Sequence, residues 1–231
     1  MKDKREDKAE KINEQKSGDY THIIVVLDRS ASMNGLTGST IAGFNGFMKE
    51  QKNVTGKATA SLVKFAGRQN WSYDMLPVKE IIDLDTSSYQ ATGGSTALCD
   101  SIVRSVHRAE GQIKEMDNKP DNVVVVIITD GLENDSQEFN KEHVTKLIEA
   151  REEEGWDFVF LGANQDAIAE GGSMGIRASN AMNYGASDVG VTQMYCCVSK
   201  GLTNYRTKRS CGDDSKIGFF VDEDEEEKTD I

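Results

Sequence analysis

The sequence predicts an α/β fold in three layers: a doubly wound, mostly parallel sheet with one antiparallel edge strand and helices on both faces. Short runs of β-branched and apolar residues, such as 22–27 and 123–128, are apolar at nearly every position. Strands of a parallel sheet have this pattern because helices cover both of their faces. Between the runs, apolar residues recur at three- and four-residue spacing, which is typical of amphipathic helices. This alternation predicts a parallel sheet between two helical layers.

The first half of the chain is predicted to supply a strand, a helix and a hairpin. Residues 21–28 predict the first strand, and a polar loop follows it as far as Ser39. A helix ending near Asn53 is expected from apolar residues at helical spacing: Ile41, Phe44, Phe47 and Met48. The segments 57–65 and 71–78 are predicted to pair as an antiparallel hairpin at the sheet edge.

The second half alternates helix and strand. A helix is predicted over 98–113 and a buried strand over 122–130. Asp135 and Glu138 have the spacing of a capping box, so we expect the next helix to begin there and to run to Glu154. The remaining predicted elements are a strand over 156–162, a short helix, a short strand near 181–184 and a final helix around 191–204.

Charge patterning divides the chain into one domain and two tails. Residues 1–18 mix both charges around a single sizeable apolar residue, Ile12, so they are expected to form a charged tail. The domain is predicted to span residues 19–209. Residues 210–231 are predicted to be a disordered acidic tail, because 222–231 carries seven acidic residues against Lys228.

Composition excludes several classes of function. The net charge of −12 argues against a nucleic-acid surface, which needs clustered Lys and Arg. No apolar run approaches the roughly 20 residues of a membrane helix. The N-terminus has no apolar stretch for a signal peptide, so a cytoplasmic location is expected. The four cysteines lack zinc-site spacing and are predicted to be reduced thiols.

Polar side chains follow two of the predicted buried strands and open the helix between them. The first strand ends in a D-x-S-x-S pattern, the second in Thr-Asp-Gly, and a Gly-Gly-Ser-Thr loop precedes the intervening helix. Because the carboxyl ends of parallel strands form the ligand-binding edge of such sheets, we expect the three segments to meet. The candidate metal ligands are Asp28, Ser30, Ser32, Thr96 and Asp130.

The chemistry of these side chains predicts which ion they would hold. Two carboxylates in one crevice repel each other unless a cation lies between them. Oxygen donors without His or Cys suit a hard ion, Mg²⁺ or else Mn²⁺ or Ca²⁺. Taken singly, each hydroxyl residue is more simply a helix cap and Asp130 a turn residue. Their joint placement after buried strands favours the metal site.

The motifs together resemble a known family. LDRSASM, GGSTALCDSI, IITDGLEN and FVFLGANQDA are similar to segments of von Willebrand factor A (vWA) domains, whose fold is Rossmann-like, and in particular to stand-alone bacterial and phage members. The D-x-S-x-S pattern, Thr96 and Asp130 resemble the metal-ion-dependent adhesion site of these domains. The resemblance extends from about Tyr20 to about Asn204.

The resemblance implies a role for each site residue. The hydroxyls of Ser30, Ser32 and Thr96 would bind the metal directly, whereas Asp28 and Asp130 would act through water. An acidic residue of a protein partner would take the open coordination position. Family members often work beside AAA-type ATPases, so a partner of that class is implied. The expected function is metal-dependent protein binding without enzymatic activity.

An enzyme is the first alternative. A magnesium-dependent phosphotransferase or hydrolase could use Asp28 as its nucleophile, as phosphatases of the haloacid dehalogenase type do, but those need Asp at the position of Ser30. The chain has no G-x-x-x-x-G-K-[ST] loop and no G-x-S-x-G elbow. The three histidines are scattered, which favours structural roles for them.

A metal-free scaffold is the second alternative, with the acidic tail driving self-association. The segment 222–227 could also act as a mobile acidic ligand for the metal of its own or a neighbouring chain. Glu133 is a candidate for tuning charge at the metal rim. We expect Asp28→Ala to remove the ion without unfolding the protein, because the sequence places Asp28 in a solvent-facing loop.

Overall fold

The computed structural model describes residues 19–92, 94–163, 166–213 and 218–220. The predicted N-terminal tail, 1–18, and the acidic segment 222–227 lie outside the described residues. None of the helices within the described ranges is both long and apolar enough to cross a bilayer.

Six strands form one sheet in the order β3-β2-β1-β4-β5-β6. Only the β2–β3 pair is antiparallel, and every other neighbouring pair is parallel. This confirms the predicted fold class, including the antiparallel strand at the edge. The strands are β1 (Tyr20–Asp28), β2 (Lys57–Phe65), β3 (Gln69–Pro77), β4 (Asn122–Thr129), β5 (Trp156–Ala163) and β6 (Ala181–Tyr184).

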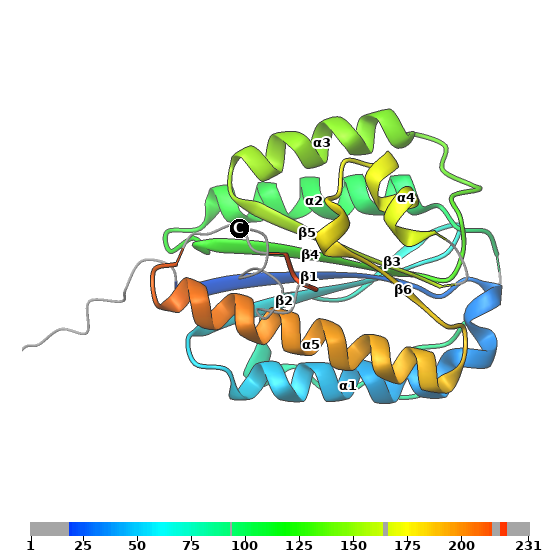
Figure 1. The fold of residues 1–231 in the computed structure, drawn as a ribbon, viewed down its shortest axis with the longest axis horizontal. Coiled ribbons are helices and arrows are strands. Elements are labelled where there is room, and N and C mark those ends of the chain that lie inside the picture. Colours follow the sequence, from blue (N-terminus) through cyan, green and yellow to red (C-terminus); the bar gives the residue numbers. More distant parts are fainter. Residues whose placement is uncertain (1–18, 93, 164–165, 214–217, 221–231) are drawn as a thin grey trace, which may run out of the picture.

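Helices cover both faces of the sheet (Figure 1). Helices α1 and α5 pack side by side on one face, and α2, α3 and α4 lie on the other. The α-helices are α1 (Thr37–Asn53), α2 (Leu98–Glu115), α3 (Lys141–Glu153), α4 (Ala167–Ser173) and α5 (Asp188–Ser210). Three short 3-10 segments are η1 (Ala31–Leu36), η2 (Val78–Glu80) and η3 (Ala178–Asn180).

The alternation of side chains along β1 explains why this strand is apolar at successive positions. Ile23, Val25 and Leu27 face the core under α1 and α5, whereas Ile24 and Val26 face the core under α2 and α3. All five are fully buried. A strand at the centre of a three-layer sandwich has no solvent face, so alternation with polar residues is absent.

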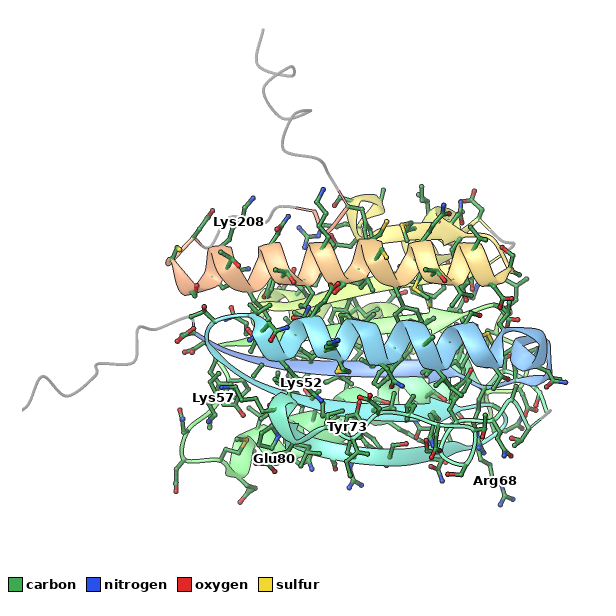
Figure 2. All side chains as sticks on the ribbon, turned by 90° about the horizontal axis from the view of Figure 1, so that it is seen from below. Lys52, Lys57, Arg68, Tyr73, Glu80 and Lys208 are labelled. Carbon is green, nitrogen blue, oxygen red and sulfur yellow. The ribbon has the colours of Figure 1, made fainter. Side chains whose placement is uncertain are left out.

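Helices α1 and α5 approach each other closely. A methyl group at Gly43 of α1 would overlap the ring of Tyr195 of α5, so only glycine fits there. The Tyr195 ring also lies 6.4 Å from that of Phe47, centroid to centroid. Figure 2 shows α1 and α5 running parallel across this face. Glycine at position 43 therefore allows the two helices to pack closely, although a glycine inside a helix by itself weakens that helix.

Three helix boundaries differ from the predicted ones. Helix α3 begins at Lys141, because the N–H of His143 donates to Oδ1 of Asn140 (3.1 Å) and the N–H of Asn140 donates to Nδ1 of His143 (3.2 Å). The predicted capping box at Asp135 and Glu138 is therefore wrong. Helix α1 starts earlier than its apolar periodicity predicted, at Thr37, and α5 continues to Ser210.

Both edges of the sheet are irregular or short. At the β3 edge, register shifts near Leu62 mark a bulge, and Met75 adopts a positive φ of 51°. The N–H of Met75 donates to the hydroxyl of Ser61 (2.9 Å) rather than to a strand carbonyl. At the other edge, β6 has only four residues. Neither edge offers a long regular ladder of free backbone groups.

Part of the predicted acidic tail packs on the domain. Phe219 is 7% exposed, and its ring stacks on that of Tyr205 in α5 with centroids 5.2 Å apart. Its N–H donates to Oδ1 of Asn180 (3.1 Å). The residues that follow helix α5 thus include at least one core contact, at Phe219.

Candidate metal centre

The sheet topology brings the two acidic motifs together. Strands β1 and β4 are parallel neighbours, with Leu27 opposite Ile128. Asp28 therefore lies opposite Thr129, and Asp130 follows one residue later. Both lie at the carboxyl edge of the sheet, at the end where η1 follows β1 in Figure 1. This is the ligand-binding edge expected of a doubly wound sheet.

Asp28 is the buried anchor of the site. It is 0% exposed, and its carboxylate accepts hydrogen bonds from the N–H of Ser30 (2.7 Å) and the hydroxyl of Thr129 (2.6 Å). Burial raises the pKa of this carboxyl above its usual range. The expectation of a solvent-facing loop carboxylate was wrong. Replacing Asp28 by Ala would leave two donors unsatisfied, so this change would lower stability as well as alter the site.

A chain of hydroxyls links the two carboxylates. The hydroxyls of Ser30 and Ser32 lie 3.1 Å apart, and the Ser32 hydroxyl donates to Oδ1 of Asp130 (2.7 Å). Burial raises the pKa of Asp130 as well. Four of the five predicted residues, Asp28, Ser30, Ser32 and Asp130, thus form one continuous polar network.

Thr96 reaches the same place from the loop before α2. Its side chain lies against Gly131, since a methyl group at Gly131 would be 3.2 Å from Oγ1 of Thr96. The N–H of Thr96 donates to Oδ1 of Asn134 (2.8 Å), and the N–H of Asn134 donates back to the Thr96 carbonyl (3.1 Å). Thr96 is joined to the acidic motif through Gly131 and Asn134. The structure therefore places all five predicted residues at one edge.

The carboxylate of Glu133, the candidate for tuning charge at the metal rim, is held by backbone N–H groups. Its carboxylate accepts from the N–H of Cys99 (2.7 Å) in the first turn of α2 and from the N–H groups of Asp135 (2.9 Å) and Ser136 (2.8 Å). Burial alone would raise the pKa of Glu133, but the hydrogen bonds outweigh it and lower the pKa. Glu133 ties the loop after β4 to the start of α2.

Asp100 holds the far side of the same loop. Its carboxylate accepts from three successive N–H groups, of Gln137 (3.1 Å), Glu138 (3.1 Å) and Phe139 (2.8 Å). Sequence reasoning missed this residue because an acidic residue in the first turn of a helix is an ordinary signal of a favourable dipole contact. The loop that carries Asp130 is thus fixed to α2 at two points.

Two buried tyrosines hold the backbone of the site from the face of the sheet that α1 and α5 cover. The hydroxyl of Tyr89 donates to the carbonyl of Asp28 (2.7 Å), and that of Tyr184 donates to the carbonyl of Thr129 (3.2 Å). Burial raises the pKa of both phenols beyond any physiological range. They remain neutral donors, so the ends of β1 and β4 are held without adding charge. No sequence signal marked either residue.

The donor set fits a hard divalent cation. It consists of two carboxylates and three hydroxyls, all with oxygen donors. Within the described residues, no group of three or more His, Cys, Asp or Glu side chains could hold a metal, so a site here depends on hydroxyl oxygens. The charge of Asp130 adds to burial in raising the pKa of Asp28, and a cation between the two carboxylates would relieve both effects.

Comparison with solved structures identifies the fold. Proximal thread matrix protein 1 from the mussel byssus aligns with 80% of this chain at 19% identity and a TM-score of 0.56. A von Willebrand factor type A protein from Catenulispora acidiphila aligns with 83% at 14% identity and a TM-score of 0.50. The fold is of the vWA type. The chain spans less than half the length of either protein, 46% and 43%.

A further structure of the mussel vWA-type protein has a zinc-occupied MIDAS motif, and it aligns with 78% of this chain and 47% of its own at 17% identity, with a TM-score of 0.56. At these identities the likeness shows the fold alone. Neither a protein-family model nor a curated protein sequence matches the chain.

Proposed function

We propose that this chain is a divalent-metal-dependent protein-binding module. The observation that carries the proposal is the pair of carboxylates, Asp28 and Asp130, that meet at the carboxyl edge of a vWA-type sheet and share a hydroxyl network. Both have raised pKa values through burial, so the site holds negative charge at a cost to the fold. A bound cation would offset that cost.

The proposed ligand roles are those that the family resemblance implies. Ser32 is exposed and Asp130 half-buried, so both can face an ion at the surface. Ser30, Ser32 and Thr96 would bind the ion directly, and Asp28 and Asp130 would hold its waters. Mg²⁺ is the proposed ion, with Mn²⁺ and Ca²⁺ as alternatives. A bound ion would supply an electrophilic position for an acidic side chain of a partner protein.

The enzyme alternative is disfavoured by the position of Asp28. A nucleophilic carboxylate needs a free oxygen aimed at its substrate, but Asp28 is fully buried, one oxygen accepts from Ser30 and the other from Thr129. The metal-free scaffold alternative is disfavoured because it contains no cation to offset the burial that raises the pKa values of both carboxyls.

Among partner classes, the sequence resemblance implies an AAA-type ATPase, which co-purification with and without EDTA would test.

Calorimetric titration of the full chain with Mg²⁺, Mn²⁺ and Ca²⁺ tests the proposal. We expect saturable one-site binding that Asp130→Asn or Ser32→Ala weakens at least tenfold, about 1.4 kcal/mol. The matched control is Asp188→Asn, which removes the same charge from an exposed position at the same edge and should leave affinity unchanged. Absence of ion binding to the natural chain would overturn the metal proposal and favour the scaffold.

A further inference from the structure

Two cations lie on the β2 side of the candidate metal centre. Lys64, the penultimate residue of β2, is only 6% exposed, and its ammonium group donates to the carbonyl of Ser88. Arg29 follows Asp28 directly; its N–H donates to the carbonyl of Phe65 (2.7 Å) and its carbonyl accepts from the N–H of Thr92 (3.2 Å). Lys64 through its ammonium group and Arg29 through its carbonyl therefore both contact the segment 88–92.

The charges of the two side chains act on each other, and neither side chain has a carboxylate partner within the described residues. Burial, and then the charge of Arg29, lowers the pKa of Lys64. Nε of Arg29 is buried and has no hydrogen-bond partner. In the described part of the chain, neither side chain forms an ion pair.

This arrangement differs from that of two other partly buried cations. The chain has 39 acidic residues against 27 basic ones, and Arg151 and Arg177 do pair with carboxylates. Arg151 pairs with Glu110, and Arg177 with Asp157 (3.0 Å). Burying charge without a counter-ion destabilises a fold, and two like charges add to the penalty. Arg29, the residue after Asp28, and the buried Lys64 carry this penalty.

The charges of the crevice become unequal once its ion is bound. A divalent ion balances Asp28 and Asp130, which leaves Arg29 and Lys64 as an excess of positive charge on that side. Two acidic residues of the loop after β4 already have other partners, because Glu133 accepts from backbone N–H groups and Asp135 accepts from the Ser95 hydroxyl. The positive charges of Arg29 and Lys64 can therefore attract an anion from another molecule.

We propose that Arg29 and Lys64 form a second anion-binding position, so that the partner segment presents two acidic side chains within a few residues of each other. One carboxylate would complete the metal site and the other would pair with the two cations. This inference rests on the proposed function and specifies its partner: a diacidic protein segment. Arg29 is suited to the second position because its guanidinium binds a carboxylate through two parallel hydrogen bonds.

Selection from a displayed random-peptide library tests the inference and needs no purified partner. The full chain is immobilised in Mg²⁺, and bound peptides are eluted with EDTA so that only metal-dependent ones are recovered. The natural chain should recover peptides with two acidic positions at a fixed spacing. The Arg29→Gln, Lys64→Met double variant should recover peptides with one. Each variant is used at an Mg²⁺ concentration that saturates it.

Arg68→Gln is the matched control, because it removes a positive charge from an exposed residue at the same end of the molecule (Figure 2). Peptides recovered on this variant should keep both acidic positions. A single acidic position on the natural chain, or two on the double variant, would overturn the inference while leaving metal-dependent binding intact. Recovery of no EDTA-released peptide would instead contradict the proposed function and the inference with it.

A double-mutant cycle gives the second measurement. For a recovered peptide, changing the second acidic residue to its amide should weaken binding to the natural chain about tenfold, the effect of losing one charge-assisted hydrogen bond. The same change should have little effect on binding to the Arg29→Gln, Lys64→Met double variant, because the contact is already absent. Equal losses on both proteins would show that the two cations do not contact this residue.

Discussion

Two buried polar clusters interrupt the apolar strand β1, one near its amino end and one at its carboxyl end. The first centres on His22, which is 0% exposed; Nδ1 lies 2.9 Å from the Thr59 hydroxyl and Nε2 lies 3.4 Å from that of Ser61. Ser61 in turn donates to Asp74 (3.1 Å). The second cluster centres on Asp28 and forms the candidate metal centre.

The two clusters differ in where their compensating groups come from. Burial lowers the pKa of His22 to about 4, so its ring is neutral, and the one acid of its cluster, Asp74, pairs with Arg108 (2.6 Å). The carboxyl-end cluster has two acids with raised pKa values. A closed, neutral network of this kind stabilises the fold, whereas an open one with excess charge is suited to a ligand. Substitutions in either cluster test this division.

The largest expected effect is on stability, from His22→Ala. This change leaves Thr59 and Ser61 without their shared partner and opens a cavity, so we expect a loss of about 3 kcal/mol in the free energy of unfolding. Urea unfolding measures the loss. Mg²⁺ affinity by calorimetry should stay within about twofold of the natural value. An equal effect on ion binding would break the division between the clusters.

The pH dependence of stability should report the same cluster. In the unfolded chain His22 binds a proton near pH 6.5, whereas the folded chain resists protonation until about pH 4. The unfolded state therefore binds more protons in this window, and stability falls as pH falls from 6.5 to 4, by up to about 3 kcal/mol from this residue. His22→Gln should flatten the curve measured in EDTA. An unchanged slope would show that His22 is not the group responsible.

At the carboxyl end, Asp130→Asn should separate function from stability. In EDTA we expect the variant to be as stable as the natural chain or more stable by about 1 kcal/mol, because a buried charge beside Asp28 is removed. We expect Mg²⁺ to raise the melting temperature of the natural chain but not that of the variant. Thermal unfolding with and without Mg²⁺ measures both effects. A variant that loses several kcal/mol in EDTA would place Asp130 among the structural residues.

The smallest expected effect comes from Gly131→Ala. The added methyl group lies 3.2 Å from Oγ1 of Thr96 and would displace that hydroxyl by a few tenths of an ångström. We expect Mg²⁺ affinity to fall about fivefold, roughly 1 kcal/mol, with little change in stability. Gly46→Ala is the control, since nothing lies within 4 Å of its added methyl group. Unchanged affinity in Gly131→Ala would remove Thr96 from the direct ligands.

The fold was predictable because its strands are marked locally. Every residue of β4 is buried, and a run such as 123–128 cannot be placed anywhere but the centre of the sheet. The start of α3 was not predictable in the same way. Asp135 is taken by Ser95 and Glu138 pairs with Arg104 (2.8 Å), both distant in sequence, so neither caps the helix. Local spacing cannot indicate such competition.

The convergence of the five candidate ligands was predictable from the sequence, but the burial of Asp28 was not. The five candidate ligands meet as expected because parallel strands end at one edge. That Asp28 is fully buried depends on Tyr89 and Thr129, which cover it from other elements. Residues that position a ligand through backbone carbonyls, as Tyr89 and Tyr184 do, have no characteristic motif. Their identification required the structure.

The irregular edges of the sheet limit how a partner can be recognised. Many peptide-binding domains extend their sheet by one strand, which needs a long, regular edge. Here the bulge near Met75 interrupts one edge and the four residues of β6 shorten the other. Backbone pairing of this kind depends little on the side chains of the bound segment. A partner that cannot pair with either edge must instead be recognised by its side chains, so its binding will be sensitive to single substitutions in the bound segment.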